Sequence, residues 1–158
     1  AASTDSLTGL LNRVSYNKAI TEINDKKPNN LACVYIDVNG LHIMNNKYGH
    51  AAGDEMLLYI ANSLKEAFYG HKVYRMGGDE FLVILQNSDL KNCEELIAKF
   101  DSECANISVK TDGEDVAVSV AKGLAMYDST RDSQFADVFN RADTAMYENK
   151  RGIKAAQA

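Results

Sequence analysis

Residues 72–85 read KVYRMGGDEFLVIL, two apolar runs on either side of a short polar insert. The runs at 72–76 and 81–85 are rich in β-branched and aromatic residues, a composition typical of strands. The glycines and acidic residues between them favour a tight turn with positive φ angles. The stretch therefore predicts a β-hairpin that carries Asp79 and Glu80 at its tip.

A second apolar run at 31–38, LACVYIDV, contains one carboxylate, Asp37. An apolar segment of this length is typical of a central strand buried on both faces. If the hairpin pairs beside this strand, Asp37 and Asp79 converge at one edge of the sheet. Two converging carboxylates repel each other unless a cation lies between them, and hard oxygen ligands suit Mg²⁺. The alternative is that Asp37 begins a turn and the hairpin tip has no chemical role, and composition alone does not decide between the two.

The remaining segments alternate between helical and strand-like periodicity. They predict a helix that Asn12 caps and that ends before Pro28, a helix at 50–68, a helix capped by Ser88 or Asp89, a strand at 116–127 interrupted by Gly123, and a helix from Phe135 that Arg151 and Gly152 end. With no repeat and no linker, residues 1–158 are interpreted as one α/β domain, with a lead-in at 1–12 and a loose tail at 152–158.

The composition is that of a soluble globular protein, since 46% of the residues are hydrophobic and 25% are charged. With 17 Lys+Arg and 22 Asp+Glu the formal net charge is −5, which argues against binding nucleic acid or an anionic membrane surface. No apolar run is long enough to span a bilayer. The three cysteines form no CxxC pair, so we expect reduced thiols in a cytoplasmic protein rather than disulfides or a zinc site.

At the hairpin, RMGGDEF at 75–81 carries the signature of the GGDEF family, the diguanylate cyclases. Three further segments resemble family motifs. DSLTGLLNR at 5–13 is similar to the opening D-x-L-T-G-L-x-N-R, 37–54 to the stretch that ends in G-H-x-x-G-D, and RADTAMY at 141–147 with Lys150 to the closing A-D-x-A-M-Y-x-x-K. The four matches occur in family order over almost the whole chain, which makes the resemblance far more specific than any one motif.

The resemblance implies both a fold and an activity. The expected fold is an α+β sandwich in which helices flank a central, mostly antiparallel sheet, similar to nucleotidyl cyclases and polymerase palm domains, with the signature on a hairpin. The family condenses two GTP into cyclic di-GMP and two pyrophosphates with Mg²⁺ or Mn²⁺, and each subunit of a homodimer presents one GTP to the other. We expect the sensory domain that normally controls dimerisation to lie outside this chain, in a parent protein that is cytoplasmic or anchored to the membrane, with no membrane contact by this domain.

By the same resemblance, Asp37, Asp79 and Glu80 are the catalytic carboxylates and metal ligands, and the backbone carbonyl of Val38 completes the metal site. The metal would activate the ribose 3′-hydroxyl and offset charge on the α-phosphate. Either Asp79 or Glu80 would assist removal of the 3′-hydroxyl proton.

The substrate contacts implied by the family fall into two groups. Asn45 and Asp54, with His50 in the same motif, would select guanine, because an amide and a carboxylate match its O6, N1–H and N2–H₂ groups. Near the triphosphate, the resemblance implies the backbone N–H groups of Gly40 and Leu41 and the side chains of His42, Lys150 and Lys154. Gly77 and Gly78 would let the backbone come close to the nucleotide. Arg75 would form either a cross-strand ion pair or a contact within the active dimer. Outside the family context, Asn45 reads as a loop residue, Asp54 as an acid in a first helical turn, and Lys150 as a cation in a last turn.

The sequence also departs from the family pattern. His42 replaces a common Lys, Asn46 replaces the usual Asp, and Lys154 stands where a phosphate-binding Arg is expected. Phe68 and His71 occupy the positions of an R-x-x-D site at which product inhibits many members, so we expect no product inhibition there. The leading hypothesis is a Mg²⁺-dependent diguanylate cyclase, and the alternative is a catalytically weak GGDEF domain that binds GTP or a protein partner.

Overall fold

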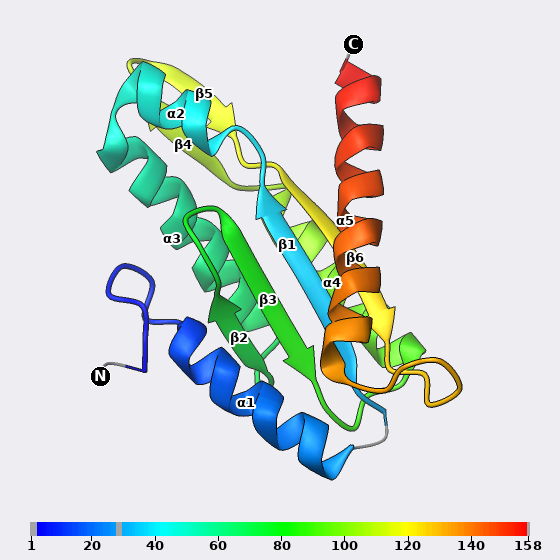
Figure 1. Cartoon of the computed structure of the whole chain (residues 1–158). Helices are drawn as coiled ribbons and strands as arrows, with labels where there is room; N and C mark the ends of the chain where they lie inside the picture. The colour runs from blue at the N-terminus through cyan, green and yellow to red at the C-terminus, as the bar shows by residue number, and fades with distance from the viewer. Residues whose placement is uncertain (1–2, 28–29, 158) are drawn as a thin grey trace.

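A computed structural model describes residues 3–27 and 30–157, which form a sheet between two layers of helices (Figure 1). In chain order the elements are α1 (Arg13–Lys26), β1 (Ala32–Val38), α2 (Leu41–Tyr48), α3 (His50–Ala67), β2 (Lys72–Arg75), β3 (Glu80–Leu85), α4 (Leu90–Cys104), β4 (Ser108–Thr111), β5 (Glu114–Ala117), β6 (Val120–Met126) and α5 (Phe135–Gln157). The sheet has the strand order β2-β3-β1-β6 with antiparallel pairing throughout, and β4 and β5 form a separate hairpin. The predicted α+β sandwich is confirmed.

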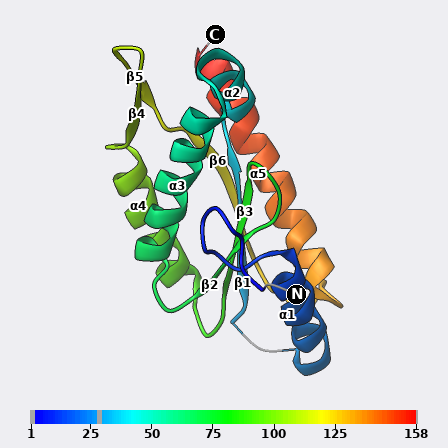
Figure 2. The same cartoon turned by 90° about the vertical axis from the view of Figure 1, so that its left-hand side faces the viewer.

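The central strand β1 organises both cores of the molecule, because all seven of its residues are buried. Alternate side chains of a strand point to opposite faces of the sheet. Val34 and Ile36 pack in the core that α3 and α4 cover, whereas Cys33 and Tyr35 pack in the core that α1 and α5 cover. Figure 2 shows these two pairs of helices on opposite sides of the sheet. None of the helices within the described residues is both long and apolar enough to cross a bilayer.

Two helices, α1 and α4, begin at a side-chain cap, whereas α2 and α3 begin after a glycine without one. Asn12 and Asp89 each accept a hydrogen bond from the backbone N–H three residues further on, which confirms Asn12 and identifies Asp89, of the two candidates Ser88 and Asp89, as the cap. α1 ends at Lys26, and Lys27 then takes the left-handed conformation with a φ of 45°. Pro28, which served as the stop signal in the sequence, lies outside the described residues.

The predicted helix end at Arg151 and Gly152, and the loose tail that follows it, are wrong within the described residues, because α5 continues to Gln157. A glycine inside a helix costs only about 1 kcal/mol relative to alanine. Ile153 offsets this cost by packing against the core that α1 and α5 cover. The longer helix places Lys154 one turn beyond Lys150 on the same rigid element.

The hairpin turn differs from its expected backbone conformation. Neither Gly77 nor Gly78 has a positive φ, so the prediction of a left-handed glycine turn is wrong. The turn is closed instead by the N–H of Met76, which donates to the carbonyl oxygen of Glu80 at 2.8 Å. Two elements were not predicted as separate units, the short helix α2 and the hairpin of β4 and β5.

Gly123 lies inside β6 and does not interrupt it, whereas the predicted strand breaks between Ala117 and Val120. A Cβ added at Gly123 would lie 2.2 Å from the carbonyl oxygen of Ala142 and 2.3 Å from the backbone nitrogen of Met146. Glycine at this position therefore lets the backbone of α5 lie directly on β6.

We expect Gly123→Ala to lower the free energy of unfolding by at least about 2 kcal/mol, because two backbones must separate to admit the new methyl group. Urea denaturation measures this change. Gly152→Ala is the matched control, since nothing lies within 4 Å of its added Cβ and alanine is the better helix former. The control should be at least as stable as the parent, and unchanged stability of Gly123→Ala would contradict the close approach.

Candidate functional site

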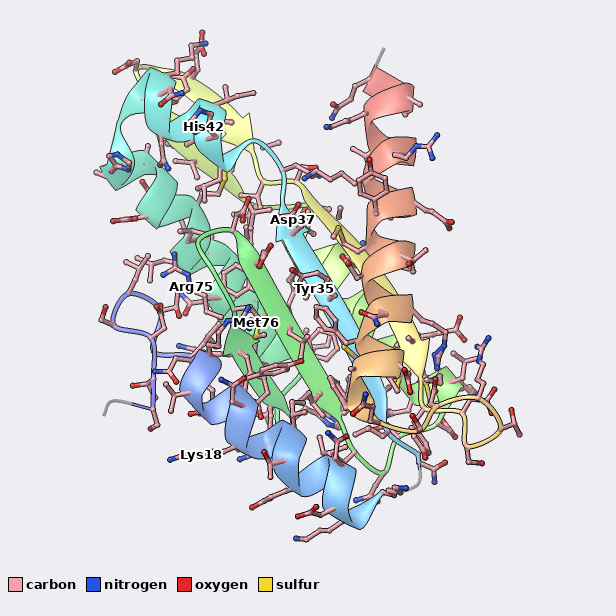
Figure 3. All side chains as sticks on the ribbon, in the orientation of Figure 1. Lys18, Tyr35, Asp37, His42, Arg75 and Met76 are labelled. Atoms are coloured by element: carbon pink, nitrogen blue, oxygen red, sulfur yellow. The ribbon has the colours of Figure 1, made fainter. Side chains whose placement is uncertain are left out.

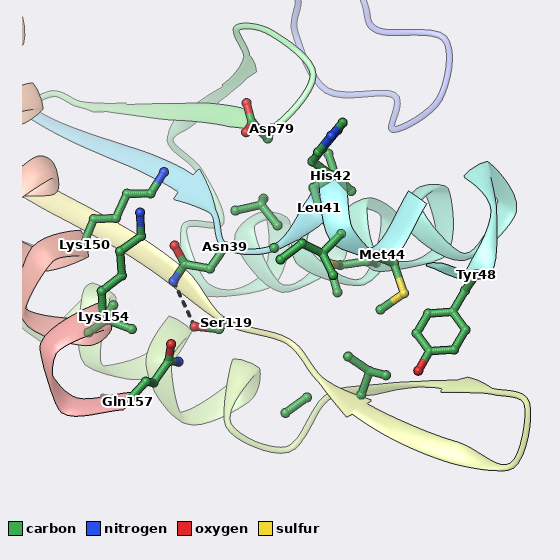
Figure 4. A pocket seen from close by; sticks show the side chains of 17 residues that line it. Asn39, Leu41, His42, Met44, Tyr48, Asp79, Ser119, Lys150, Lys154 and Gln157 are labelled. Atoms are coloured by element: carbon green, nitrogen blue, oxygen red, sulfur yellow. Dashed lines mark hydrogen bonds between the residues drawn. The ribbon is translucent and has the colours of Figure 1, made fainter. Parts of the chain in front are cut away.

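Two carboxylates, Asp37 and Asp79, converge where β1 ends and the hairpin turns. Asp37 is labelled in Figure 3 and Asp79 in Figure 4. Asp37 lies directly opposite Glu80 in the pairing of β1 with β3. The N–H of Val38 donates to the carbonyl oxygen of Asp79 at 2.9 Å. Burial raises the pKa of Asp79, and the neighbouring charge of Asp37 raises it further. The structure thus brings Asp37 and Asp79 together as the sequence predicted.

Lys150 of α5 forms an ion pair with one member of this carboxylate pair, Asp37. Its Nζ donates to Oδ2 of Asp37 at 2.5 Å, and the Asp37 side chain is only 11% exposed. The hydrogen bond to Asp37 raises the pKa of Lys150, so the ammonium group is held in its charged form. The residue predicted to contact phosphate therefore neutralises a buried carboxylate.

Glu80 lies to one side of this pair. Burial raises the pKa of Tyr35, and the adjacent Glu80 carboxylate, hydrogen-bonded to its hydroxyl, adds to the shift. Over residues 3–27 and 30–157, no three carboxylate, histidine or cysteine side chains are close enough together to hold a metal ion. Asp37 and Asp79 alone supply hard oxygen donors of the kind that Mg²⁺ prefers, at a place where a cationic ammonium group already lies. The pair fits a divalent cation, and the ligand roles of Glu80 and Val38 stay predictions.

The hairpin tip is anchored from within the chain by Arg75. Its guanidinium group donates to both carboxylate oxygens of Asp5 at 3.1 Å, to the carbonyl of Gly77 at 3.2 Å and to that of Gly78 at 3.0 Å. Asp5 also accepts hydrogen bonds from the backbone N–H and the hydroxyl of Thr8. The ion pair that the sequence left open as one role of Arg75 is therefore present, although with the N-terminal loop rather than across the strands.

A cleft of about 540 Å³ lies between α2, the hairpin tip and the end of α5 (Figure 4). It gathers these predicted site residues: Val38, Gly40, Leu41, His42, Asp79, Lys150 and Lys154. Asn39 was not predicted, and its amide donates to the hydroxyl of Ser119 at 2.9 Å across the floor of the cleft. These two residues are 80 positions apart in the chain. Asn39 lies in the family stretch at 37–54, which could have indicated it, whereas Ser119 lies in none of the four motifs.

The beginning of α2 lines this cleft and offers backbone donors. Gly40 has a φ of 74° and precedes the helix, and its carbonyl accepts the N–H of Met44 at 2.9 Å. The first N–H groups of a helix have no partner within it and favour an anion. His42 follows on the exposed face, where its Nε2 lies 3.0 Å from the side-chain nitrogen of Asn46. Two departures from the family pattern are thus in contact with each other.

The predicted guanine-binding residues lie outside the residues that line the cleft. Asn45 is on α2, and His50 and Asp54 are exposed near the start of α3. Oδ1 of Asn45 is buried and has no hydrogen-bond partner in the described structure. A Cβ on Gly53 would lie 1.7 Å from that oxygen, so this glycine allows the Asn45 amide to lie against α3. Gly53 was missed as a site residue, although it is the second glycine of the G-H-x-x-G-D motif.

Over residues 2–155, the sequence matches the family described as diguanylate cyclase, GGDEF domain. The chain belongs to the GGDEF family. This membership agrees with the four sequence motifs and with the position of the signature on the hairpin of β2 and β3.

The similar proteins include diguanylate cyclases and one protein named as a cyclic di-GMP phosphodiesterase. A diguanylate cyclase of Vibrio cholerae is 28% identical over 156 residues, which cover 95% of this GGDEF chain and 47% of the relative. The cyclic di-GMP phosphodiesterase PdeR of Escherichia coli is 31% identical over 153 residues, 96% of this chain and 23% of the relative. The crystal structure of the DgcB GGDEF domain from Caulobacter crescentus in complex with c-di-GMP has a TM-score of 0.84 and 25% identity, and the match covers 96% of this chain and 92% of that one. The chain spans less than half the length of the two curated relatives.

The Asp5–Arg75 ion pair makes the stability of this GGDEF domain depend on pH. Burial alone would raise the pKa of Asp5, but hydrogen bonds from Thr8 and Arg75 outweigh it and lower the pKa below its ordinary 3.8. A carboxyl group with a depressed folded pKa contributes stability above its unfolded pKa and loses that contribution as the pH falls through the folded value.

We therefore expect the parent to be more stable than Asp5→Asn at neutral pH and the difference to shrink as the pH falls below about 4. Urea denaturation of both proteins between pH 7 and pH 3 measures it. A difference that stays constant over this range would contradict the role of the ionised carboxylate.

Proposed function

We propose that this chain is the catalytic domain of a diguanylate cyclase, which condenses two GTP into cyclic di-GMP and two pyrophosphates. The observation that carries the proposal is the convergence of Asp37 and Asp79 at the mouth of a cleft, in a chain of the GGDEF family. Phosphoryl and nucleotidyl transfer depend mainly on positioning and charge stabilisation. A carboxylate pair of which one member is buried, next to lysines and helical N–H groups, is suited to that task.

The proposed cofactor is Mg²⁺ or Mn²⁺, held by Asp37 and Asp79, with Glu80 and the carbonyl of Val38 as further ligands on the family resemblance. When bound, the cation activates the ribose 3′-hydroxyl and stabilises charge on the α-phosphate. Asp79 or Glu80 accepts the 3′-hydroxyl proton. Gly78 has nothing within 4 Å of an added Cβ, which leaves the hairpin tip open to an approaching nucleotide.

The proposed nucleotide position runs across α2. Asn45 and Asp54, with His50 nearby, bind the guanine, while the N–H groups around Gly40 and Leu41 bind phosphate. Lys150 and Lys154 add positive charge along the same cleft. Because one chain holds one GTP, the reaction needs a second copy of the domain facing the first.

Three observations favour a second candidate function, a catalytically weak GGDEF domain that regulates through GTP or a protein partner. The His42 ring lies against Asn46, whereas the family commonly has a lysine at the position of His42. Lys154 also lacks the two-pronged donor geometry of an arginine. PdeR, which is named as a phosphodiesterase, is similar to 96% of this chain, although the match covers only 23% of PdeR.

An assay for product separates the two functions. The chain, dimerised through a fused coiled coil and incubated with GTP and Mg²⁺, should form cyclic di-GMP, identified by mass. Asp79→Asn should lower the rate at least about 100-fold, because it removes charge from the cation site. Asp112→Asn removes the same charge from the exposed β4–β5 turn and should keep the parental rate. No cyclic di-GMP from the dimerised parent would favour the regulatory function instead.

Product inhibition at the R-x-x-D position is not expected in this chain. Phe68 is 1% exposed, and its ring packs 6.2 Å from that of Phe100, so it faces the core rather than solvent. His71 is half-buried, and burial lowers its pKa, which favours the neutral ring. Adding cyclic di-GMP during the assay should leave the initial rate unchanged. Tight binding by calorimetry that His71→Ala abolishes would show that this prediction is wrong.

A further inference from the structure

We propose that Lys150 competes with the divalent cation for Asp37, so that cation binding releases its ammonium group to the nucleotide phosphates. The inference rests on the proposed metal site and adds a second role for a residue expected only to contact phosphate. Lys150 would then link the two binding events within one site.

The first step of the argument is the burial of Asp37. A carboxylate in a strand whose residues are all buried is strongly destabilising unless it is paired. Lys150 supplies that pairing at 2.5 Å, and its own side chain is 29% exposed. The single positive charge of Lys150 therefore offsets the charge of Asp37, the member of the pair with which it forms its ion pair.

The second step is the incompatibility of two cations at one carboxylate pair. An ammonium group and a divalent ion bound to the same oxygens repel each other strongly in a partly buried site. Cation binding to Asp37 and Asp79 therefore requires Lys150 to move away. Once Lys150 has moved away from Asp37, the bound divalent ion offsets the carboxylate charge in its place.

The third step concerns where the ammonium group goes. Lys150 is carried by α5, whose backbone lies directly on β6 at Gly123, so the side chain rather than the helix has to move. Lys154 projects into the same cleft one helical turn further on (Figure 4). A released Lys150 consequently stays over the cleft, within reach of a triphosphate. Cation binding then frees the Lys150 ammonium group to bind phosphate, so the cation raises the affinity of the site for nucleotide.

The test is the affinity of the purified domain for Mn²⁺ without nucleotide, measured by electron paramagnetic resonance. Lys150→Met should bind Mn²⁺ about tenfold more tightly than the parent or better, because no ammonium group has to be displaced. Lys154→Met is the matched control, since it removes the same charge from the same cleft one turn away. It should change the affinity far less than Lys150→Met does.

The outcomes distinguish this inference from the proposed function. Equal Mn²⁺ affinities of the two variants would overturn the competition and leave the metal site standing. Mn²⁺ binding to none of the three proteins would overturn both. If Lys150→Met does not fold, NMR of the parent decides: the Lys150 side-chain signals should shift on saturation with Mg²⁺, and signals that do not move would overturn the inference.

Discussion

The structure depends on how one carboxylate is accommodated at the end of a fully buried strand. β1 is apolar enough to lie at the centre of the sheet and to contribute side chains to both cores, and Asp37 lies near its end. Water cannot solvate such a group, so the chain must bring charge to it. The hairpin adds to the problem, since Asp79 places a second negative charge nearby, and α5 brings the ammonium group of Lys150 that pairs with Asp37.

The supports of the pair come from distant parts of the sequence. In the N-terminal loop, Asp5 accepts hydrogen bonds from Thr8 and from the Arg75 guanidinium group, which also donates to two carbonyls of the hairpin turn. Lys150 reaches Asp37 across 113 positions of sequence. The carboxylate pair and its lysine are thus held in place by three elements. The hairpin turn carries Asp79, α5 carries Lys150, and β1 between them carries Asp37.

Local signals in the sequence predicted most of the fold. The apolar runs gave β1 and the hairpin, and the Asn12 and Asp89 caps marked two helix starts, because these features depend on neighbouring residues alone. The continuation of α5 past Gly152 could not be predicted, since Ile153 is stabilised by packing against residues far away in the chain. The eight residues of α2 are too few for a clear helical period.

The candidate site was predictable to a different extent. The convergence of Asp37 and Asp79 followed from pairing two recognisable strands, and the family motifs supplied the rest of the residues. Gly53 stands in a motif, but its close fit against Asn45 is not visible in the sequence, and neither are the Lys150–Asp37 ion pair and the Asn39–Ser119 hydrogen bond. Each arises only when two elements meet in space.

The contact at Gly123 has a consequence for the geometry of the whole helix above it. Where two elements meet through side chains, small slides and rotations are absorbed by changes of rotamer. At Gly123 the carbonyl of Ala142 and the nitrogen of Met146 face bare backbone, and no such cushion exists. At this point the spacing between α5 and β6 is therefore set by main-chain atoms, and side-chain rearrangements cannot change it.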